Sequence, residues 1–469
     1  MKKWIKLIIC ALILLPLFMW NWHTQKSLPT DLSMAGPLHQ TDDVTFVSDI
    51  TYEKNGKQQH DHALFQQALT LIKEAEEVLV VDLFLYNDDY NHQKATYDDR
   101  AAQLTNALIQ KKKQRPNMPI HVITDPINTT YGANDSRFLD ALTAADIDVV
   151  ITNLKPLRDS NPFYSSLWRS YLQWWPISQN SFLPNAFNPD GGKMSVGAYL
   201  NLINFKANHR KIVLNEKEAL IMSANVSHDG SSLHSNIGFV VSGGVLQDIY
   251  TSENAVMQMS GKSLPKHLFD DASKGEIGVK VITEGQIQQA MLKTIKQARK
   301  GDTLQIGVFY IAERELIHAL KDAAARDVDI QMILDANRDA FGIKKNGVPN
   351  RPVAHELSKE PNITIRWYDT HGEQFHSKFL MLQQSDQTTI IGGSANFTRR
   401  NIEDYNLETN VYIQAPRTAA ISTQMENYFN RLWTNEDGTY TVDYDQFADD
   451  SMWKTVLYRV QEFTGLSTF

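Results

Sequence analysis

The chain has 469 residues and a formal net charge of −8, with 42% hydrophobic and 21% charged residues. This ordinary globular composition excludes a disordered or collagen-like chain and a polytopic membrane protein. The acidic balance disfavours nucleic acid as a partner, because proteins that hold a phosphate backbone usually carry a basic excess. The single cysteine, Cys10, lies in an N-terminal apolar run, which excludes disulfides and cysteine-based metal sites or nucleophiles from the folded body.

Residues 1–28 are predicted to form a single-pass membrane anchor. Three lysines among the first six residues precede an apolar run at 7–20, and the 19 residues of 4–22 suffice for a marginal span if Lys6 reaches the interface. The positive charges then stay in the cytoplasm and the body lies on the extracytoplasmic side. The alternative is a cleaved signal peptide and a secreted body, but no small-residue cleavage site follows Trp20.

The body contains one large internal duplication. Residues 65–86 and 287–311 both show the pattern of an amphipathic helix followed by an apolar strand. In each half another helix leads to a strand that ends in an aspartate, Asp125 or Asp335, which we expect to cap the following turn. Alternating strands and helices predict an α/β fold in both halves, with largely buried sheets.

The spacing between the two halves locates an insertion. Asp125 lies 84 residues before His209, whereas Asp335 lies only 41 residues before His376. The first half therefore carries extra residues at 153–200. The predicted segments are 1–28 (anchor or signal), 29–43 (linker), 44–270 (first unit, with the insertion), 271–435 (second unit) and 436–469 (tail ending in a helix).

Each half reaches the same short motif. The first half has His-Arg-Lys followed by Ser-Ala-Asn, and the second has His-Ser-Lys followed by Ser-Ala-Asn. Alternation places His and Lys on one face of a strand, and the returning strand brings Ser and Asn beside them. Two such faces around one pocket suit a phosphodiester: lysines neutralise it, asparagines donate to it, one imidazole attacks phosphorus and the other protonates the leaving alkoxide.

These residues resemble the phospholipase D superfamily, whose signature is H-x-K-x4-D followed by G-S-x-N, present twice; the resemblance covers about residues 44–433. The resemblance implies a bilobal α/β/α fold with a central site shared by both lobes, a phosphohistidine intermediate, and chemistry without metal or cofactor. It makes His209 the nucleophile and His376 the general acid, by resemblance alone. The other residues that it implies are Lys211 and Lys378 as phosphate clamps, Asn225 and Asn396 as further phosphate ligands, and Ser223 and Ser394 as supporting members.

The sequence departs from the family signature in several places. Glu216 and Gln383 stand at the two aspartate positions, and Met222 replaces the glycine before the first serine. Gly238 stands where the second half has Glu408. Four further histidines lack metal-site spacing and are expected to be packing or surface residues. They are His121, His228, His234 and His371.

We therefore expect a membrane-tethered enzyme that acts on phospholipids, as a hydrolase or as a transphosphatidylase of the cardiolipin synthase kind. The alternatives are a nuclease or other phosphodiesterase of the same superfamily, and a catalytically silent module that binds anionic lipid. The insertion holds eight aromatic residues between positions 163 and 187. They form either a private core or a lid over the pocket, with Trp174 and Trp175 contacting the membrane interface and admitting lipid.

Overall fold

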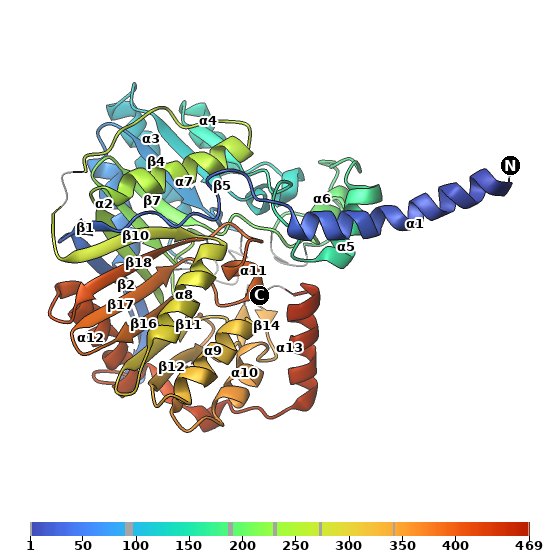
Figure 1. Cartoon of the computed structure of the whole chain (residues 1–469). Helices are drawn as coiled ribbons and strands as arrows, with labels where there is room; N and C mark the ends of the chain where they lie inside the picture. The colour runs from blue at the N-terminus through green and yellow to red at the C-terminus, as the bar shows by residue number, and fades with distance from the viewer. Residues whose placement is uncertain are drawn as a thin grey trace.

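The computed structural model describes residues 2–89, 97–185, 191–227, 232–271, 274–340, 343–467 and 469. Two β-sheets form its centre and most helices lie around them (Figure 1). One sheet has eight strands and the other has nine. The predicted mixed α/β architecture is confirmed.

The eight-stranded sheet is built from the first half of the chain. In spatial order its strands are β3 (Lys57–Asp61), β2 (Val44–Lys54), β9 (Asn236–Ser242), β8 (Glu218–Met222), β7 (Lys211–Asn215), β4 (Leu79–Leu83), β5 (Ile120–Thr124) and β6 (Asp148–Ile151). The run β4-β5-β6 is parallel, and the other neighbours are antiparallel. Strands β4, β5 and β7 are buried throughout, as expected for the centre of a covered sheet.

The nine-stranded sheet is built mainly from the second half. Its strands are β1 (His39–Thr41), β10 (Ile277–Thr283), β18 (Thr409–Pro416), β17 (Gln387–Gly393), β16 (Lys378–Gln383), β11 (Thr303–Val308), β12 (Asp329–Asp335), β15 (Ile363–Tyr368) and β19 (Thr441–Asp443). The order β10-β18-β17-β16-β11-β12-β15 repeats β2-β9-β8-β7-β4-β5-β6. Lys211 pairs with Leu83 and Lys378 pairs with Val308, so the two motifs occupy the same register.

The two sheets share one hydrophobic core. A single cluster of buried residues includes Ile212 and Phe239 from the first sheet and Met381 and Ile390 from the second. Contact between the sheets is close at Gly392, where an added Cβ would lie 2.7 Å from the ring of Phe239. Glycine is therefore needed at this point of β17.

Helices pack on both sheets, and two of them, α7 (Val245–Met259) and α12 (Ala420–Thr434), contribute to the core that the sheets share. Those of the first half are α2 (Leu64–Glu74), α3 (Arg100–Gln114), α4 (Arg137–Ala144) and α7 (Val245–Met259). Those of the second half are α8 (Gly285–Gln297), α9 (Arg314–Ala324), α10 (Asn350–Leu357), α11 (Arg399–Ile402), α12 (Ala420–Thr434) and α13 (Met452–Thr464). The smaller elements are η1 (Pro126–Gly132), β13 (Asp339–Ala340), β14 (Ile343–Lys344) and η3 (Tyr444–Gln446). The final helix expected in the tail is α13.

Helix α1 (Lys2–Gln25) projects from the body (Figure 1). Within the described part of the chain, it is the one helix long and apolar enough to cross a membrane, a test that a signal sequence also meets. The insertion forms α5 (Pro162–Leu167), the π-helical turn η2 (Trp168–Leu172) and α6 (Val196–Leu202). Helix α1 packs on α5 and η2, where the Tyr171 hydroxyl donates to the Leu12 carbonyl.

Candidate active site

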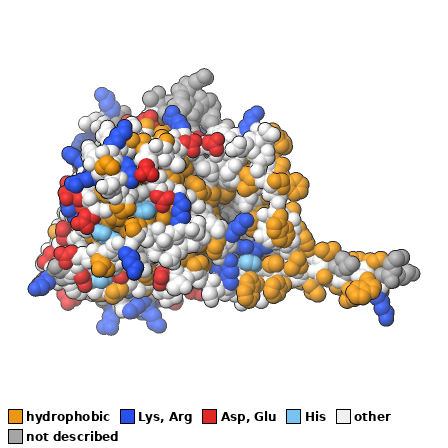
Figure 2. All heavy atoms as spheres, turned by 90° about the horizontal axis from the view of Figure 1, so that it is seen from above, with side chains coloured by type: hydrophobic (Ala, Val, Ile, Leu, Met, Phe, Trp, Pro, Cys, Tyr) orange, Lys and Arg blue, Asp and Glu red, His pale blue; other side chains and the backbone are white. Residues whose placement is uncertain are grey.

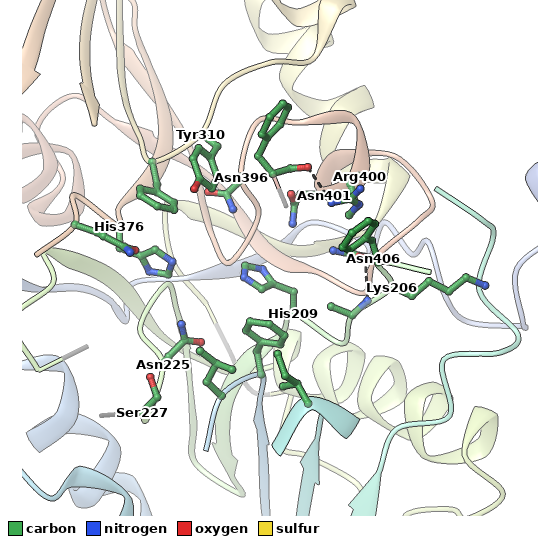
Figure 3. A pocket seen from close by; sticks show the side chains of 18 of the residues that line it. Lys206, His209, Asn225, Ser227, Tyr310, His376, Asn396, Arg400, Asn401 and Asn406 are labelled. Carbon is green, nitrogen blue, oxygen red and sulfur yellow. Dashed lines mark hydrogen bonds between the residues drawn. The ribbon is translucent and has the colours of Figure 1, made fainter. Parts of the chain in front are cut away.

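The two motif histidines face one cavity of about 130 Å³ (Figure 3). Each lies just before a central strand, His209 before β7 and His376 before β16. The other half of the chain holds each of them, because the His209 amide donates to the Leu407 carbonyl at 2.9 Å and the His376 amide donates to the Ser235 carbonyl at 2.8 Å. Residues from both halves therefore line the cavity.

Two buried aspartates position the segments that carry the histidines. Asp125 and Asp335 each accept the amide two residues further on, which confirms the predicted turn caps. Their second carboxylate oxygens accept the amide of Asn208 at 2.7 Å and of Phe375 at 2.8 Å, the residues just before the two histidines. Burial raises the pKa of both aspartates to about 7.

The two histidines have different partners at Nδ1. The Nδ1–H group of His209 donates to both carboxylate oxygens of the fully buried Glu408, at 2.8 and 3.0 Å. The Nδ1–H group of His376 donates instead to the amide oxygen of Asn236 at 3.0 Å. One imidazole thus has an anionic partner and the other a neutral one.

The residue equivalent to Glu408 is Asn236, so the sequence comparison that placed Gly238 there was wrong. Ser394 bonds Glu408 across 14 positions of the chain, whereas Ser223 bonds Asn236 across 13. Gly238 lies two residues further along β9. Gly238 serves packing, because an added Cβ would lie 2.4 Å from Leu64.

Lys211 and Lys378 lie behind the histidines and are not among the described residues of the cavity wall. Each ammonium group donates to the carbonyl of its own motif histidine at 2.6 Å. They also lie over the rings of Phe84 and Phe309, at 5.1 and 5.4 Å. Burial lowers the pKa of Lys211 to about 7 and that of Lys378 well below its ordinary value, the latter also because of Lys211.

The electrostatics of the cavity favour neutral histidines. Burial lowers the pKa of His209 to about 4; Lys211 adds to the shift and Glu408 opposes it. Burial and then Lys378 hold the pKa of His376 well below its ordinary value. Burial acts to raise the pKa of Glu408, but His209, Lys211 and the Ser394 hydroxyl together lower it below its ordinary value.

The predicted asparagines lie on the cavity wall, and the serines lie behind it. The side-chain oxygens of Asn225 and Asn396 are buried with no protein partner among the described residues. Each carboxamide therefore retains an unmet hydrogen-bonding group at the wall. Ser223 and Ser394 bond the Nδ1 partners of the two histidines and thereby position them.

Trp174 and Trp175 lie on the surface of the insertion, 73% and 53% exposed. None of the insertion aromatics that the structure describes lines the catalytic cavity. Trp168 is the one that is buried among them, and Phe187 lies outside the described residues. A role of the tryptophan pair at a membrane stays a prediction.

Several residues of the cavity wall were not predicted from the sequence. They are Phe84, Lys206, His234, Phe309, Tyr310, Arg400, Asn401 and Asn406. Extending the second motif by a dozen residues would have reached Arg400 and Asn406. His234, expected as packing or surface, lies 6.0 Å from His376 between ring centres, and its Nδ1 accepts the Gln374 amide.

The remaining departures from the family signature, and the remaining histidines, lie away from the cavity wall. Glu216 accepts the amides of Glu76 and Glu77 at the turn before β4, and Gln383 bonds Gln305 on the neighbouring strand. His121 pairs with Asp148, and His371 lies in a loop near Asp369. His228 lies outside the described residues. Among the described residues, no group of three or more His, Cys, Asp or Glu side chains is arranged to hold a metal ion.

Comparison with known proteins identifies relatives of the second half and of the fold. A family described as "Cardiolipin synthase, PLD-like domain" matches residues 291–433. Phosphatidylserine synthase of Haemophilus influenzae Rd KW20 is similar in structure, with a TM-score of 0.58 and 9% identity over 97% of this chain and 98% of that chain. At this identity the likeness concerns the fold alone. No curated protein sequence matches the chain.

Two other solved structures are more loosely similar. Polyphosphate kinase of Porphyromonas gingivalis has a TM-score of 0.47 and 10% identity, over 90% of this chain and 53% of that chain. The phospholipase D family member Nuc of Salmonella typhimurium has a TM-score of 0.28 and 16% identity, over 35% of this chain and 98% of that chain.

Proposed function

We propose, from the family match at residues 291–433 and from the fold, that the chain is a member of the phospholipase D superfamily and that it cleaves or transfers the phosphodiester of a phospholipid between His209 and His376. The family and the fold support a phospholipid-modifying enzyme. The observation that carries the proposal is the pair of imidazoles in one cavity, each hydrogen-bonded at Nδ1 so that Nε2 is available for chemistry. Phospholipase D and cardiolipin synthase activities both fit this arrangement.

The different Nδ1 partners of the two histidines, Glu408 and Asn236, support different roles for them. His209 attacks phosphorus through Nε2, the N–P bond forms, and the P–O bond to the leaving alcohol breaks. The imidazole gains positive charge in this step, and the adjacent carboxylate of Glu408 stabilises it. His376 gives its proton to the leaving alkoxide, and its neutral partner Asn236 leaves the imidazolium acidic enough to do so.

The second step regenerates the enzyme. Neutral His376 removes a proton from water or from an acceptor alcohol, whose oxygen attacks the phosphohistidine and breaks the N–P bond. Water yields phosphatidate, and an alcohol yields a new phosphodiester. Substrate binding also sets the protonation state, because the phosphodiester anion raises the pKa of the nearby imidazoles and ammonium groups.

The decisive experiment uses purified full-length protein in detergent micelles with defined phospholipids, with and without glycerol or phosphatidylglycerol. Product separation distinguishes hydrolysis from transfer, and acid-labile label from a phosphate-labelled lipid reports the intermediate. We expect His209→Ala or His376→Ala to lower turnover by about 10²- to 10⁴-fold. More than a tenth of the activity in either variant, or lipid binding without turnover or phosphoenzyme, would contradict the proposal.

We further propose that α1 anchors the body outside the cytoplasmic membrane and that Trp174 and Trp175 contact the lipid interface. Replacing both tryptophans by alanine is expected to weaken liposome binding and turnover of long-chain lipid, while cleavage of a soluble short-chain phosphodiester stays near normal. Leu268→Ala, at an 88% exposed loop position, is the control. An equal loss on both substrates, or a large fall in melting temperature, would contradict this role.

A further inference from the structure

A second cavity lies beside the catalytic one. Its volume is about 170 Å³, slightly more than that of the catalytic cavity. Tyr131 and Lys206 belong to the walls of both cavities, so the two are neighbours. Figure 3 shows Lys206 extending away from His209 at this junction. The second cavity is therefore next to any molecule bound between the histidines.

The wall of the second cavity combines an apolar surface with one unsatisfied donor. Pro126, Leu154, Trp168 and Ile177 supply apolar surface. Trp168 is only 3% exposed, and its indole Nε1 is buried with no hydrogen-bond partner among the described residues. A buried indole N–H normally has an acceptor, so a ligand that carries an oxygen next to an apolar chain would match this side chain of the wall.

The outer rim of this cavity belongs to the apolar surface around α1. Ile177 is 45% exposed and follows the exposed pair Trp174 and Trp175. Hydrophobic side chains cover α1 and also gather on the adjoining part of the body (Figure 2). A hydrocarbon chain entering from a bilayer around α1 thus meets apolar side chains at the rim.

We propose that the second cavity holds an acyl chain of the lipid substrate, whose phosphate lies between His209 and His376 and whose ester carbonyl accepts the Trp168 N–H. This inference rests on the proposed function. It makes the insertion the element that selects long-chain over short-chain phosphodiesters.

Filling the cavity tests the proposal. Ile177→Trp narrows it at a half-exposed position, and Trp168→Phe removes the N–H donor while keeping an aromatic ring. For a long-chain lipid in mixed micelles we expect kcat/KM to fall at least tenfold in Ile177→Trp and two- to tenfold in Trp168→Phe. For a short-chain soluble phosphodiester that has no acyl ester, both variants stay within twofold of wild type. Phe182→Trp, in the same insertion but outside this wall, is the matched control.

A binding measurement distinguishes this proposal from the proposed function. The His209→Ala chain, with and without Ile177→Trp, is titrated with a pyrene-labelled long-chain phospholipid, and Ile177→Trp is expected to raise Kd at least tenfold. Unchanged long-chain binding, or an equal loss on both chain lengths, would overturn the acyl-chain site. If wild-type protein binds the lipid in this way but turns nothing over, the proposed function fails and the acyl-chain site stands.

An independent observation concerns α13, the helix of the C-terminal tail. One side packs on α10 through the buried Tyr458, whose hydroxyl accepts a hydrogen bond from Arg314 at 2.6 Å. The other side carries large apolar residues at helical spacing, each half exposed or more. They are Met452, Trp453, Val456, Val460 and Phe463.

The position of α13 identifies what this face contacts. The helix lies at the edge of the body toward which α1 projects, and its axis runs across the direction of α1 (Figure 1). A bilayer crossed by α1 would therefore lie parallel to α13. Beyond the helix, the Arg400 guanidinium bonds the carbonyls of Gly465, Ser467 and Phe469, and Phe469 lines the catalytic cavity.

We infer that α13 lies in the membrane interface with its apolar face in the lipid and holds the cavity mouth at the bilayer surface. The inference uses the proposed anchor and needs no activity. Cys10→Ser leaves a chain without cysteine, into which Phe463→Cys introduces one site for a fluorescent label. In liposomes with shallow nitroxide-labelled lipids, we expect the label at 463 to lose at least half of its fluorescence.

Leu268→Cys, in the loop between α7 and β10, is the matched control and should be quenched by less than a tenth. Equal quenching at both sites, or no quenching at 463, would overturn the interfacial position. If the label at position 463 becomes shielded from solvent in detergent as the protein concentration rises, a second copy of the chain covers this face. That result would also overturn the interfacial position of α13.

Discussion

At the scale of single residues, Glu408 and Asn236 occupy equivalent places yet give the two histidines opposite surroundings. Glu408 is a buried carboxylate beside His209, and Asn236 is a neutral amide beside His376. The near-identical motifs of the two halves do not distinguish the imidazoles, so the chemical difference comes from residues outside the motifs. Two substitutions test the roles inferred from it.

Glu408→Gln keeps the shape of the side chain and a hydrogen-bond acceptor for His209 but removes the charge. We expect formation of the acid-labile phosphoenzyme to slow by about 10²-fold or more, because charge on the attacking imidazole loses its stabilisation. Rapid-quench measurement with labelled lipid gives this rate. Ser394→Ala, which removes a hydrogen bond to Glu408 but leaves its charge, should cost less than tenfold. A Glu408→Gln rate within tenfold of wild type would refute the assignment.

Asn236→Asp places a carboxylate beside His376 and should raise the pKa of that imidazole by roughly 1 to 3 units. The general acid must hold its proton, so activity is lost as the pH rises through its pKa. The alkaline limb of kcat/KM against pH is therefore expected to move to higher pH, and Asn236→Ala should not move it upward. A shift of the acid limb alone would assign His376 as the nucleophile.

At the scale of elements, the site depends on pairing between segments far apart in the sequence. The strands β7 and β16 carry the lysines, while backbone carbonyls before β9 and β18 hold the histidines of the opposite half. Asp125 and Asp335 tie the ends of β5 and β12 to the same segments. The geometry of the two imidazoles therefore requires both sheets to pack in register.

Gly392→Ala tests that packing, because the new methyl group would clash with Phe239 across the sheet interface. Overpacking of this kind costs about 1–3 kcal/mol, so the melting temperature should fall. Phe239→Leu in the same chain makes room and should recover part of the loss. Differential scanning fluorimetry measures both, and no loss in the single variant would contradict the close contact.

At the scale of the whole molecule, three apolar surfaces come from separate parts of the chain: α1, the insertion, and α13. The insertion packs on α1, and α13 lies at the edge of the body toward which α1 projects (Figure 1). In the proposed function these surfaces place the cavity of His209 and His376 beside a bilayer, which would supply the phospholipid substrate.

The orientation of the molecule follows from the N-terminal lysines, which should remain in the cytoplasm. Protease added to intact spheroplasts is expected to degrade the body, whereas a cytoplasmic protein should survive as the control. Release of a soluble body that begins near residue 25 to 36 would instead indicate a signal peptide. Survival of the body in intact spheroplasts would contradict the orientation.

Local patterns determined the α/β architecture, the duplication and the candidate histidines of this protein. Strand and helix periodicity depends on neighbouring residues, and a repeated motif is visible without any contact. The turn caps at Asp125 and Asp335 were predictable for the same reason, because the bond spans two residues.

Only the tertiary structure decided what surrounds the histidines. The contact between His209 and Glu408 spans 199 positions, and that between His376 and Asn236 spans 140. Gly238, which the sequence comparison chose instead, lies two residues beyond Asn236 in the same strand. The lysines lie behind the site rather than on its wall, and the insertion aromatics outside it, because burial depends on how the two sheets and α1 pack. Pairings and burial of this kind are set by packing between distant segments, which local periodicity does not encode.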